Sequence, residues 1–337
     1  MKYNSRSYSN KKLIYLCKKK KIRFESGHAP WINFESENTS FGKCFRKLAF
    51  YPKFLPLFIS SDHGVSWSSK IDKREKETIY PYFTWNKKKY LELKKLNKKV
   101  YFIKHPWIYY KEKYLDKKNL KKKREGTLVF FLHSNSHVKA KYFNLAKYIN
   151  QLKKLDKKFH PISIALYQGD INQKLHLKLR KYKINLVTTG NVNSQNFIDH
   201  FYDLISNFEF VSSPTSSSTI GSHFFYSINA GINFFFFGKR VKYENINLKS
   251  YFSKKKYMVL SDYGFPDEVN KIKLLEKLFS KKGNNLSNKK INLINEYMGY
   301  KASMSRVKIS LIVWLSLFKN ILTCVKIYFF LIKMKFV

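Results

Sequence analysis

Short apolar segments alternate with helical stretches through the second half of the chain, and this alternation restricts the fold more than any other feature. After Gly126 the apolar segments are residues 127–132, 162–166, 185–187, 208–211, 234–237 and 257–260. Between them, apolar residues recur at the three-and-four spacing of a helix face in residues 142–155, 196–205 and 221–230. This βαβαβ pattern predicts an α/β fold with a parallel sheet, whose ligands bind at the carboxyl ends of the strands.

Polar and small residues collect where these strands are predicted to end. They are His133 and Ser134 after the first strand, Gln168 and Asp170 after the second, and Gly190 after the third. Because parallel strands end at one edge of a sheet, this layout favours a nucleotide-binding crevice. The alternative is a set of ordinary polar surface loops.

The segment 208–239 carries the strongest signal for a ligand. A buried strand is predicted at 208–211, the hydroxyl-rich run 212–219 follows it, and Gly221 then opens a predicted helix. The N-terminus of a helix has unpaired N–H groups and a positive partial charge, so it suits an anionic phosphate. The alternative is a Ser-rich surface loop with an ordinary N-cap.

These patterns together predict five consecutive parts of the chain. They are a basic loose N-terminus (1–23), an α/β domain (24–115), a basic linker (116–125), a second α/β domain that carries the predicted crevice (126–300) and a C-terminal amphipathic helix (301–337). Within the first domain, residues 54–59 and 100–103 are predicted strands.

The formal charge of +44 would ordinarily indicate nucleic-acid binding. Only eight of the 66 basic residues are arginine, however, and the lysines are spread over the whole chain. Recognition of bases and phosphates relies strongly on arginine, so nucleic acid is not the expected partner. The positive field would still attract anionic substrates or anionic lipid.

Other composition features narrow the class of protein. Cys17, Cys44 and Cys324 are far apart and lack a C-x-x-C partner, so neither a disulfide framework nor a zinc site is predicted. The first residues lack the pattern of a secretory signal, and a cytosolic location is expected. The G-x-G-x-x-G and G-x-x-x-x-G-K-[ST] signatures are both missing, which argues against a dehydrogenase and a P-loop ATPase.

On residues 127–136, 161–170 and 212–238, the second half of the chain resembles the donor-binding domain of GT-B glycosyltransferases, particularly those of bacterial surface-polysaccharide synthesis. The resemblance implies two Rossmann-like domains that face a cleft. It also implies that a nucleotide-activated sugar is the substrate, that no cofactor is needed, and that hydroxyls at a helix N-terminus hold its phosphate. The residues that the resemblance places there are Ser216, Ser217, Ser218, Thr219, Gly221 and Ser222.

Two short motifs in the first half look like motifs of related transferases. They are Asp62-His63-Gly64 and the His-Pro step at His105. Bacterial sialyltransferases carry an acidic pair before glycine, a His-Pro step and a Ser-rich motif in this order, and His63 stands where their second acid would be. CDP-glycerol glycerophosphotransferases instead carry a His-Gly motif in the N-terminal domain.

Glycosyl transfer needs a base for the acceptor hydroxyl and a group that neutralises the leaving phosphate. His63, with Asp62 beside it, is the predicted base, and an Asp-His-Gly turn without a chemical role is the alternative. Candidate cations for the phosphate are Lys104, His105 and Lys239. No D-x-D sequence occurs, and His133 and His137 lack a third ligand, so the reaction is expected to be metal-independent.

Residues 311–337 are strongly apolar, yet Lys319, Lys326 and Lys333 recur every seven residues, which predicts a basic amphipathic helix. Contact with an anionic membrane surface and packing back onto the protein are both compatible with this pattern.

The leading hypothesis is a glycosyltransferase that moves a sugar from a nucleotide-activated donor to a surface-polysaccharide or lipid-linked glycan acceptor. The alternatives are a CDP-glycerol-type polyol phosphotransferase and a non-catalytic basic protein that binds nucleic acid or membrane.

Overall fold

The computed structural model describes residues 6–18, 38–65, 67–96, 98–115, 123–134, 138–142, 144–246, 256–283 and 285–333. These residues form two compact units. Unit 1 comprises those within Met1–Lys19, Asn119–Val192 and Asp199–Asn295, and unit 2 comprises those within Lys20–Lys118, Asn193–Ile198 and Glu296–Val337. Each unit mixes helices with a parallel sheet, so the predicted α/β class is confirmed.

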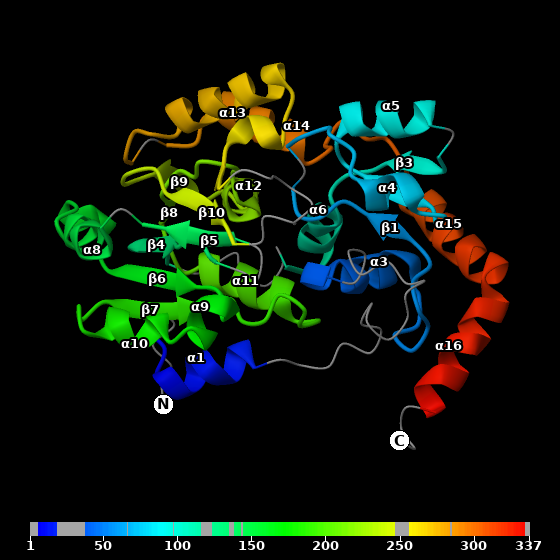
Figure 1. The fold of residues 1–337 in the computed structure, drawn as a ribbon, viewed down its shortest axis with the longest axis horizontal. Helices are drawn as coiled ribbons and strands as arrows, with labels where there is room; N and C mark the ends of the chain where they lie inside the picture. The colour runs from blue at the N-terminus through cyan, green and yellow to red at the C-terminus, as the bar shows by residue number, and fades with distance from the viewer. Residues whose placement is uncertain are drawn as a thin grey trace. The chain divides into compact units, whose positions relative to one another are not determined.

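Unit 1 is built on a five-stranded parallel sheet in the order β7-β6-β4-β8-β9 (Figure 1). The strands are β4 (Thr127–Phe130), β6 (Ile162–Leu166), β7 (Asn185–Thr188), β8 (Phe210–Ser213) and β9 (Asn233–Phe236). The chain begins in the middle with β4, moves outward to β7 and returns with β8 on the other side of β4. This is the order of the first five strands of a Rossmann sheet, and it reverses between β4 and β8.

Helices cover both faces of this sheet, because apolar side chains leave each strand on both sides. On one face Val129 lies in a core with residues from α1 (Asn10–Cys17), α8 (Leu145–Lys153), α9 (Gln168–Asn172) and α10 (Leu175–Arg180). On the other face Phe130 stacks against Phe201 of α11 (Phe197–Ile205) and His223 of α12 (Ser222–Asn229). The predicted helices at 142–155, 196–205 and 221–230 are therefore confirmed, with ends shifted by up to three residues.

A small antiparallel sheet in the order β11-β10-β5 completes the strands of unit 1. Its strands are β5 (Val138–Lys141), β10 (Lys242–Asn245) and β11 (Tyr257–Met258), and helices α13 (Pro266–Leu278) and α14 (Asn288–Tyr297) follow them. The prediction of a buried main-sheet strand at 257–260 is wrong, because only Tyr257–Met258 is extended and it pairs with β10. The short, lysine-bearing β5 and β10 were not predicted.

The predicted loose N-terminus is wrong for its described part. Ser9 accepts a hydrogen bond from the backbone N–H of Lys12 and so caps α1. Leu13 and Cys17 of this helix are buried in the core of unit 1. The apolar run that contains this pair also includes the exposed Ile14 and Tyr15, so it shows no helical periodicity. Residues 1–5 and 19–23 lie outside the described part of the chain.

Unit 2 holds a three-stranded parallel sheet in the order β1-β2-β3. Its strands are β1 (Ser60–Ser61), β2 (Tyr82–Thr84) and β3 (Val100–Phe102), and the helices before the C-terminal pair are α3 (Phe41–Ala49), α4 (Lys73–Glu77), α5 (Lys87–Lys95) and α6 (Pro106–Tyr110). The predicted strand at 100–103 is confirmed. The one at 54–59 is wrong, since these residues are irregular and the strand begins at Ser60. Most of the predicted linker 116–125 lies outside the described residues.

The C-terminal segment forms two helices and not the single helix predicted for 301–337. They are α15 (Arg306–Lys319) and α16 (Ile321–Lys333), with a bend of 66° between them (Figure 1). Within the described residues, neither helix alone has the length and hydropathy to cross a membrane; only the bent pair taken together meets those criteria. Residues 334–337 lie outside the described part.

Candidate functional site

A cavity of about 220 Å³ lies in unit 1 beside the carboxyl ends of β4 and β8, where the strand order reverses. Ligands of doubly wound sheets bind at this switch point. The lining residues come from the loops after β4 and β8, the start of α12 and the antiparallel sheet: Phe131, Leu132, His133, Val138, Ser218, Thr219, Gly221, His223, Tyr243, Met258 and Tyr263. Sites for drug-sized ligands measure about 300–1,000 Å³, so this cavity suits a phosphate with part of its attached group.

Ser216 shapes the loop that follows β8. Its Oγ accepts hydrogen bonds from the backbone N–H groups of Ser218 at 3.0 Å and Thr219 at 3.2 Å. The guanidinium of Arg240, which pairs with Glu276, donates to the Ser216 carbonyl at 2.6 Å. The Ser216 hydroxyl is thus occupied in holding a tight turn, and it does not line the cavity.

The predicted phosphate-binding residues divide into two groups. Ser218, Thr219 and Gly221 line the cavity, whereas Ser216, Ser217 and Ser222 are not among its lining residues. The Ser217 hydroxyl is directed to the antiparallel sheet, where it donates to the Met258 carbonyl at 2.9 Å and accepts from the Tyr243 N–H at 3.1 Å. The hydroxyl-rich run therefore combines structural serines with serine and threonine residues at the cavity.

Gly221 and His223 form the wall of the cavity at the start of α12. Gly221 is the N-cap residue and offers no side chain to the first turn. A Cβ at this position would lie 2.6 Å from both Cε1 and Nδ1 of His223, so only glycine lets the imidazole fold back against the helix end. The ring also stacks on Phe130, with 4.9 Å between the centroids.

The His223 side chain is held in its neutral form. Burial, with a smaller contribution from the neighbouring His133, lowers the pKa of His223 to about 3. Its Nε2 is buried and has no hydrogen-bond partner among the described residues. Leaving a buried polar atom unpaired costs about 1–3 kcal/mol, which makes this atom a candidate to contact a ligand.

His133 also lines the cavity and is held by the loops after β4 and β6. Its ring stacks on Tyr167 at 4.1 Å between centroids. The Asp170 carboxylate accepts hydrogen bonds from the backbone of Tyr167, at 3.0 Å, and of Ser134. A Cβ at Gly169 would lie 2.9 Å from the Ser134 carbonyl oxygen, so this glycine lets the two loops meet. Asp170 and Ser134 were predicted to line the cleft, and they instead fix the loop that presents His133.

The carboxyl group of Asp170 is strongly affected by its surroundings. Burial raises the pKa of Asp170 to about 7, although the hydrogen bonds from Tyr167 and Ser134 act in the opposite direction. The group therefore titrates near neutral pH, close to the His133 loop.

Gln168 and Gly190 lie outside the cavity lining. Gly190 faces α1, because a Cβ there would lie 3.1 Å from the Leu16 carbonyl oxygen. The backbone N–H of Asn191 also donates to that oxygen at 3.1 Å. Helix α1 thus covers the end of β7, where Gly190 was predicted to line the ligand cleft. Gln168 begins α9, and its buried Oε1 has no partner among the described residues.

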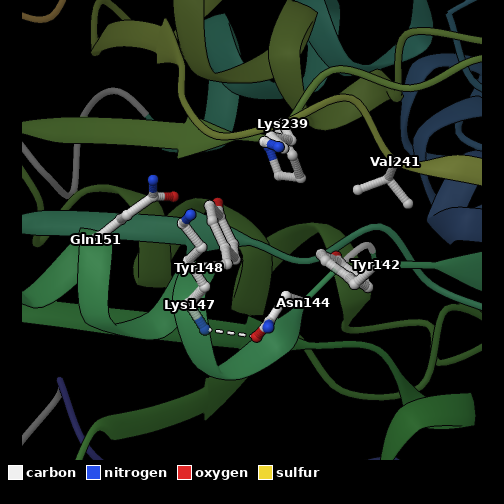
Figure 2. A pocket seen from close by; sticks show the side chains of 8 residues that line it. Tyr142, Asn144, Lys147, Tyr148, Gln151, Lys239 and Val241 are labelled. Carbon is white, nitrogen blue, oxygen red and sulfur yellow. Dashed lines mark hydrogen bonds between the residues drawn. The ribbon is translucent and has the colours of Figure 1, made fainter.

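Lys239 lines a separate, smaller cavity in unit 1. Figure 2 shows its side chain facing Lys147 and Tyr148 of α8, and Asn144 capping that helix through the backbone N–H of Lys147. The volume is about 30 Å³, close to that of one water molecule and far too small for a nucleotide. Lys239 does not line the main cavity.

In unit 2, Asp62 lies at the carboxyl end of β1 and is enclosed by hydrogen-bond donors. Lys89 Nζ contacts its Oδ1 at 3.0 Å, Tyr82 donates to the same atom at 2.9 Å, and Thr84 donates to Oδ2 at 2.6 Å. Lys89 and Tyr82 also donate to Glu75, at 2.7 and 2.8 Å. The side chain of Asp62 is 0% exposed, so its environment is that of a buried ion pair.

The charges in this network stabilise one another. Burial alone would lower the pKa of Lys89, but the carboxylates of Asp62 and Glu75 outweigh burial and hold that pKa above its ordinary value. Burial raises the pKa of Glu75, and Lys89 opposes this rise. Lys89 therefore carries its charge at neutral pH and is shared between the two carboxylates.

His63 and His105 have opposite surroundings in unit 2. His63 is exposed in the turn after Asp62. His105 is fully buried, its Nδ1 accepts from the Trp107 N–H at 3.1 Å, and its ring hydrogen-bonds the backbone of Gly64. Burial holds the pKa of His105 well below its ordinary value, so the ring is neutral and caps α6. The two predicted motifs do meet, through the hydrogen bond between the His105 ring and the backbone of Gly64.

No group of three His, Cys, Asp or Glu side chains within the described residues is arranged to hold a metal ion. The expectation of a metal-independent reaction stays a prediction. No protein-family model, no curated protein and no solved structure matches the chain.

Two features of the cavity were not predicted. His223 follows the hydroxyl-rich run by only four residues, and its position in the first turn of the predicted helix could have marked it. Tyr243 and Met258 come from the antiparallel sheet, whose short strands show little periodic pattern of apolar residues. A search for aromatic and histidine side chains in the first turns of predicted helices would have found His223 but would have missed Tyr243 and Met258.

Proposed function

We propose that unit 1 binds the phosphate of a nucleotide-activated sugar in the cavity at the β4–β8 switch point, and that the protein is a metal-independent glycosyltransferase. One observation carries this proposal: the cavity lies at the ligand-binding edge of a Rossmann-ordered sheet and is lined by Ser218, Thr219 and the start of α12. Backbone N–H groups and hydroxyls at such a position suit a phosphate. The uncharged His223 supplies a further donor or acceptor.

The proposed reaction moves a sugar between two oxygens. The acceptor hydroxyl oxygen bonds to the anomeric carbon, the bond from that carbon to the donor phosphate breaks, and the nucleotide leaves with the bonding electrons. The base that takes the hydroxyl proton is His63 in this proposal, because it is exposed while Asp62 is sealed in its ion pair. The proposal thus includes the GT-B arrangement, with unit 1 as the donor domain and unit 2 as the acceptor domain.

The acceptor and location are part of the same proposal. A surface-polysaccharide or lipid-linked glycan is proposed as acceptor, made on the cytosolic side of a membrane. The strongly positive charge of the chain would draw an anionic donor to the protein.

Nucleotide binding is the first test. We expect at least one of CMP, UDP, GDP and CDP to raise the melting temperature of the full chain, because a ligand that binds only the folded state stabilises it. If none does so, and duplex DNA binds with a steep loss of affinity on adding salt, the proposal fails in favour of a nucleic-acid binder.

Turnover is the second test. His63→Ala should abolish release of nucleotide from the donor while leaving the nucleotide-dependent thermal shift unchanged, and His160→Ala, at an exposed histidine of unit 1, should change neither. Retained turnover in His63→Ala would remove this base. A polyol phosphotransferase would instead release CMP from a CDP-polyol donor, with the phosphate transferred to the acceptor.

A further inference from the structure

Helices α15 and α16 of unit 2 carry a continuous exposed apolar stripe. Its members follow one another at spacings of three and four: Val307, Leu311, Leu315, Phe318, Leu322, Val325 and Phe329. Three of them are largely exposed, Val307 at 79%, Leu322 at 76% and Phe329 at 69%. Exposed apolar patches of this extent mark interaction sites on soluble and peripheral proteins.

The opposite side of α15 is fixed to the rest of unit 2, and Tyr328 of α16 donates a hydrogen bond to the Phe54 carbonyl. Ile309, Val313 and Leu317 of α15 are buried, and the helix packs on α3. Ser316 donates to the Phe58 carbonyl at 2.5 Å, and Trp314 Nε1 donates to the Ala49 carbonyl at 3.0 Å. The stripe is therefore the outer face of an anchored element.

Basic residues border the stripe along one side. Lys308 and Lys319 of α15 and Lys326 of α16 each follow a stripe residue directly in sequence, so each lies beside the stripe on its own helix, and all three are exposed. From Tyr297 to the end of the sequence there is no aspartate or glutamate. An apolar face bordered by lysine and free of acid is the composition of helices that lie in anionic membrane interfaces.

The end of α3 extends this surface. Phe50, 78% exposed, lines an open apolar hollow together with Val307, Leu311 and Trp314. It also lines a neighbouring cavity of about 430 Å³ whose charged lining residues are Lys43, Arg46, Lys47 and Lys53. Apolar and cationic surfaces thus adjoin at Phe50, as they would where acyl chains give way to anionic headgroups.

We propose that unit 2 docks onto an anionic lipid surface through the α15–α16 stripe, with Phe50 at its edge. Charge selects this occupant over a second copy of the chain. Two copies meeting through the stripe would oppose lysine-bordered, acid-free faces on molecules of formal charge +44, whereas anionic headgroups would compensate them. Docking by unit 2 and nucleotide binding by unit 1 are separate properties, so either can fail alone.

Vesicle binding by the full chain tests the proposal. We expect the unaltered protein to sediment with vesicles that contain phosphatidylglycerol. The triple variant Leu311→Gln, Leu322→Gln, Phe329→Gln should have a partition coefficient at least about tenfold lower, because apolar burial drives interfacial binding. The matched control is Ile79→Gln, Leu177→Gln, Leu274→Gln, which removes three exposed apolar side chains from other elements. It should partition as the unaltered protein does.

A dye readout distinguishes insertion from simple charge attraction. The three native cysteines are buried, so an environment-sensitive dye should react mainly with an introduced Leu322→Cys, or with Ile79→Cys as control. On adding vesicles, emission should shift to shorter wavelength for the label at position 322 and stay unchanged at position 79.

Three results would overturn the proposal. The first is vesicle binding by the triple variant equal to that of the unaltered protein, which would leave charge alone as the cause. The second is an unchanged dye signal at position 322 in a vesicle-bound sample. The third is a dimer in solution that the triple variant converts to monomer with no vesicle binding by either form, which would assign the stripe to a second copy.

Discussion

In each unit a parallel strand is followed by a polar sequence motif, Asp62-His63-Gly64 after β1 and the hydroxyl-rich run after β8. The surroundings of these two strand ends, here called corners, are opposite in kind. In unit 2 the Asp62 corner is closed: the carboxylate is fully buried and receives hydrogen bonds from Lys89, Tyr82 and Thr84. In unit 1 the corner after β8 is open, with a cavity lined by Ser218 and by His223, whose Nε2 lacks a partner among the described residues. Polar residues at strand ends thus serve either stability or binding, and the degree of hydrogen-bond satisfaction separates the two.

This difference predicts where substitutions act. At a satisfied buried corner, removal of one group should cost folding stability. At an open corner, removal should cost ligand affinity with little effect on folding.

The largest effect is expected for Lys89→Met. This change leaves the buried carboxylates of Asp62 and Glu75 without their cation, and breaking a buried pair in this way typically costs about 3–5 kcal/mol. All five tryptophans belong to the sequence ranges of unit 2, so tryptophan fluorescence during denaturant unfolding follows this unit.

The control for this substitution is Lys95→Met. Lys95 pairs with Glu92 at 2.7 Å, but both side chains are substantially exposed, at 71% and 47%. The expected loss is less than about 1 kcal/mol. Equal losses for the two variants would mean that the Asp62 corner is not the closed stabilising network described here.

The second prediction concerns pH and two groups near the open corner. The pKa of Asp170 is raised to about 7 in the folded chain, so its contribution to stability is greatest at acidic pH and falls as pH rises from about 4 to about 7. The pKa of His223 is lowered to about 3, so its contribution is present at neutral pH and falls as pH drops below about 6.5. The two slopes oppose each other between about pH 4 and 6.5.

Single substitutions should expose each slope. Asp170→Asn should gain stability relative to the unaltered protein as pH rises through this window, and His223→Gln should gain relative stability as pH falls, each by up to about 1.4 kcal/mol per pH unit. Far-UV circular dichroism measures the unfolding, with tryptophan fluorescence marking the contribution of unit 2. Stability differences that stay constant with pH would show that neither group is as buried as its surroundings indicate.

A third prediction tests the contact between Gly221 and His223. Gly221→Ala places a Cβ 2.6 Å from the imidazole and should displace the ring, weakening nucleotide binding by about tenfold, or about 1.4 kcal/mol. In a His223→Ala background, the same change should cost much less, because the clashing ring is gone. Titration calorimetry of all four proteins measures this coupling, and additive losses would place the effect of Gly221 elsewhere.

The main sheet was predictable because its strands and helices repeat one local pattern. Five buried strands and three helices follow directly from apolar spacing, and the ligand edge follows from parallel topology. Helix α1 was missed because only Leu13 and Cys17 anchor it, too few to produce a periodic signal. The Asn320 break between α15 and α16 was also missed, since apolar spacing continues across it.

The site was less predictable than the fold, because side-chain partners come from distant parts of the sequence. Asp62 was expected beside a substrate, but Lys89 is 27 residues away and its pairing depends on how α5 packs on the sheet. Gly190 was expected in a cleft, and α1 covers it. Sequence position locates the edge of the sheet, while packing decides which groups there stay accessible.

The smallest expected effects test the contrast inside the hydroxyl-rich run itself. Ser217 holds the antiparallel sheet through Met258 and Tyr243, so Ser217→Ala should cost about 1 kcal/mol of unfolding free energy in unit 1. Ser218 lines the cavity, and its hydroxyl has one long contact of 3.4 Å with the Ser216 hydroxyl, so Ser218→Ala should cost less stability than Ser217→Ala and weaken nucleotide binding by a few-fold, through the loss of one hydrogen bond to the proposed phosphate. Far-UV circular dichroism and calorimetry on the same two proteins separate these outcomes. The two residues are adjacent and chemically identical, so the comparison depends only on their surroundings. If Ser217→Ala weakened nucleotide binding and Ser218→Ala weakened folding, the hydroxyl that holds the antiparallel sheet would be the one that contacts the ligand, and the contrast between the Asp62 site and the cavity after β8 would not hold.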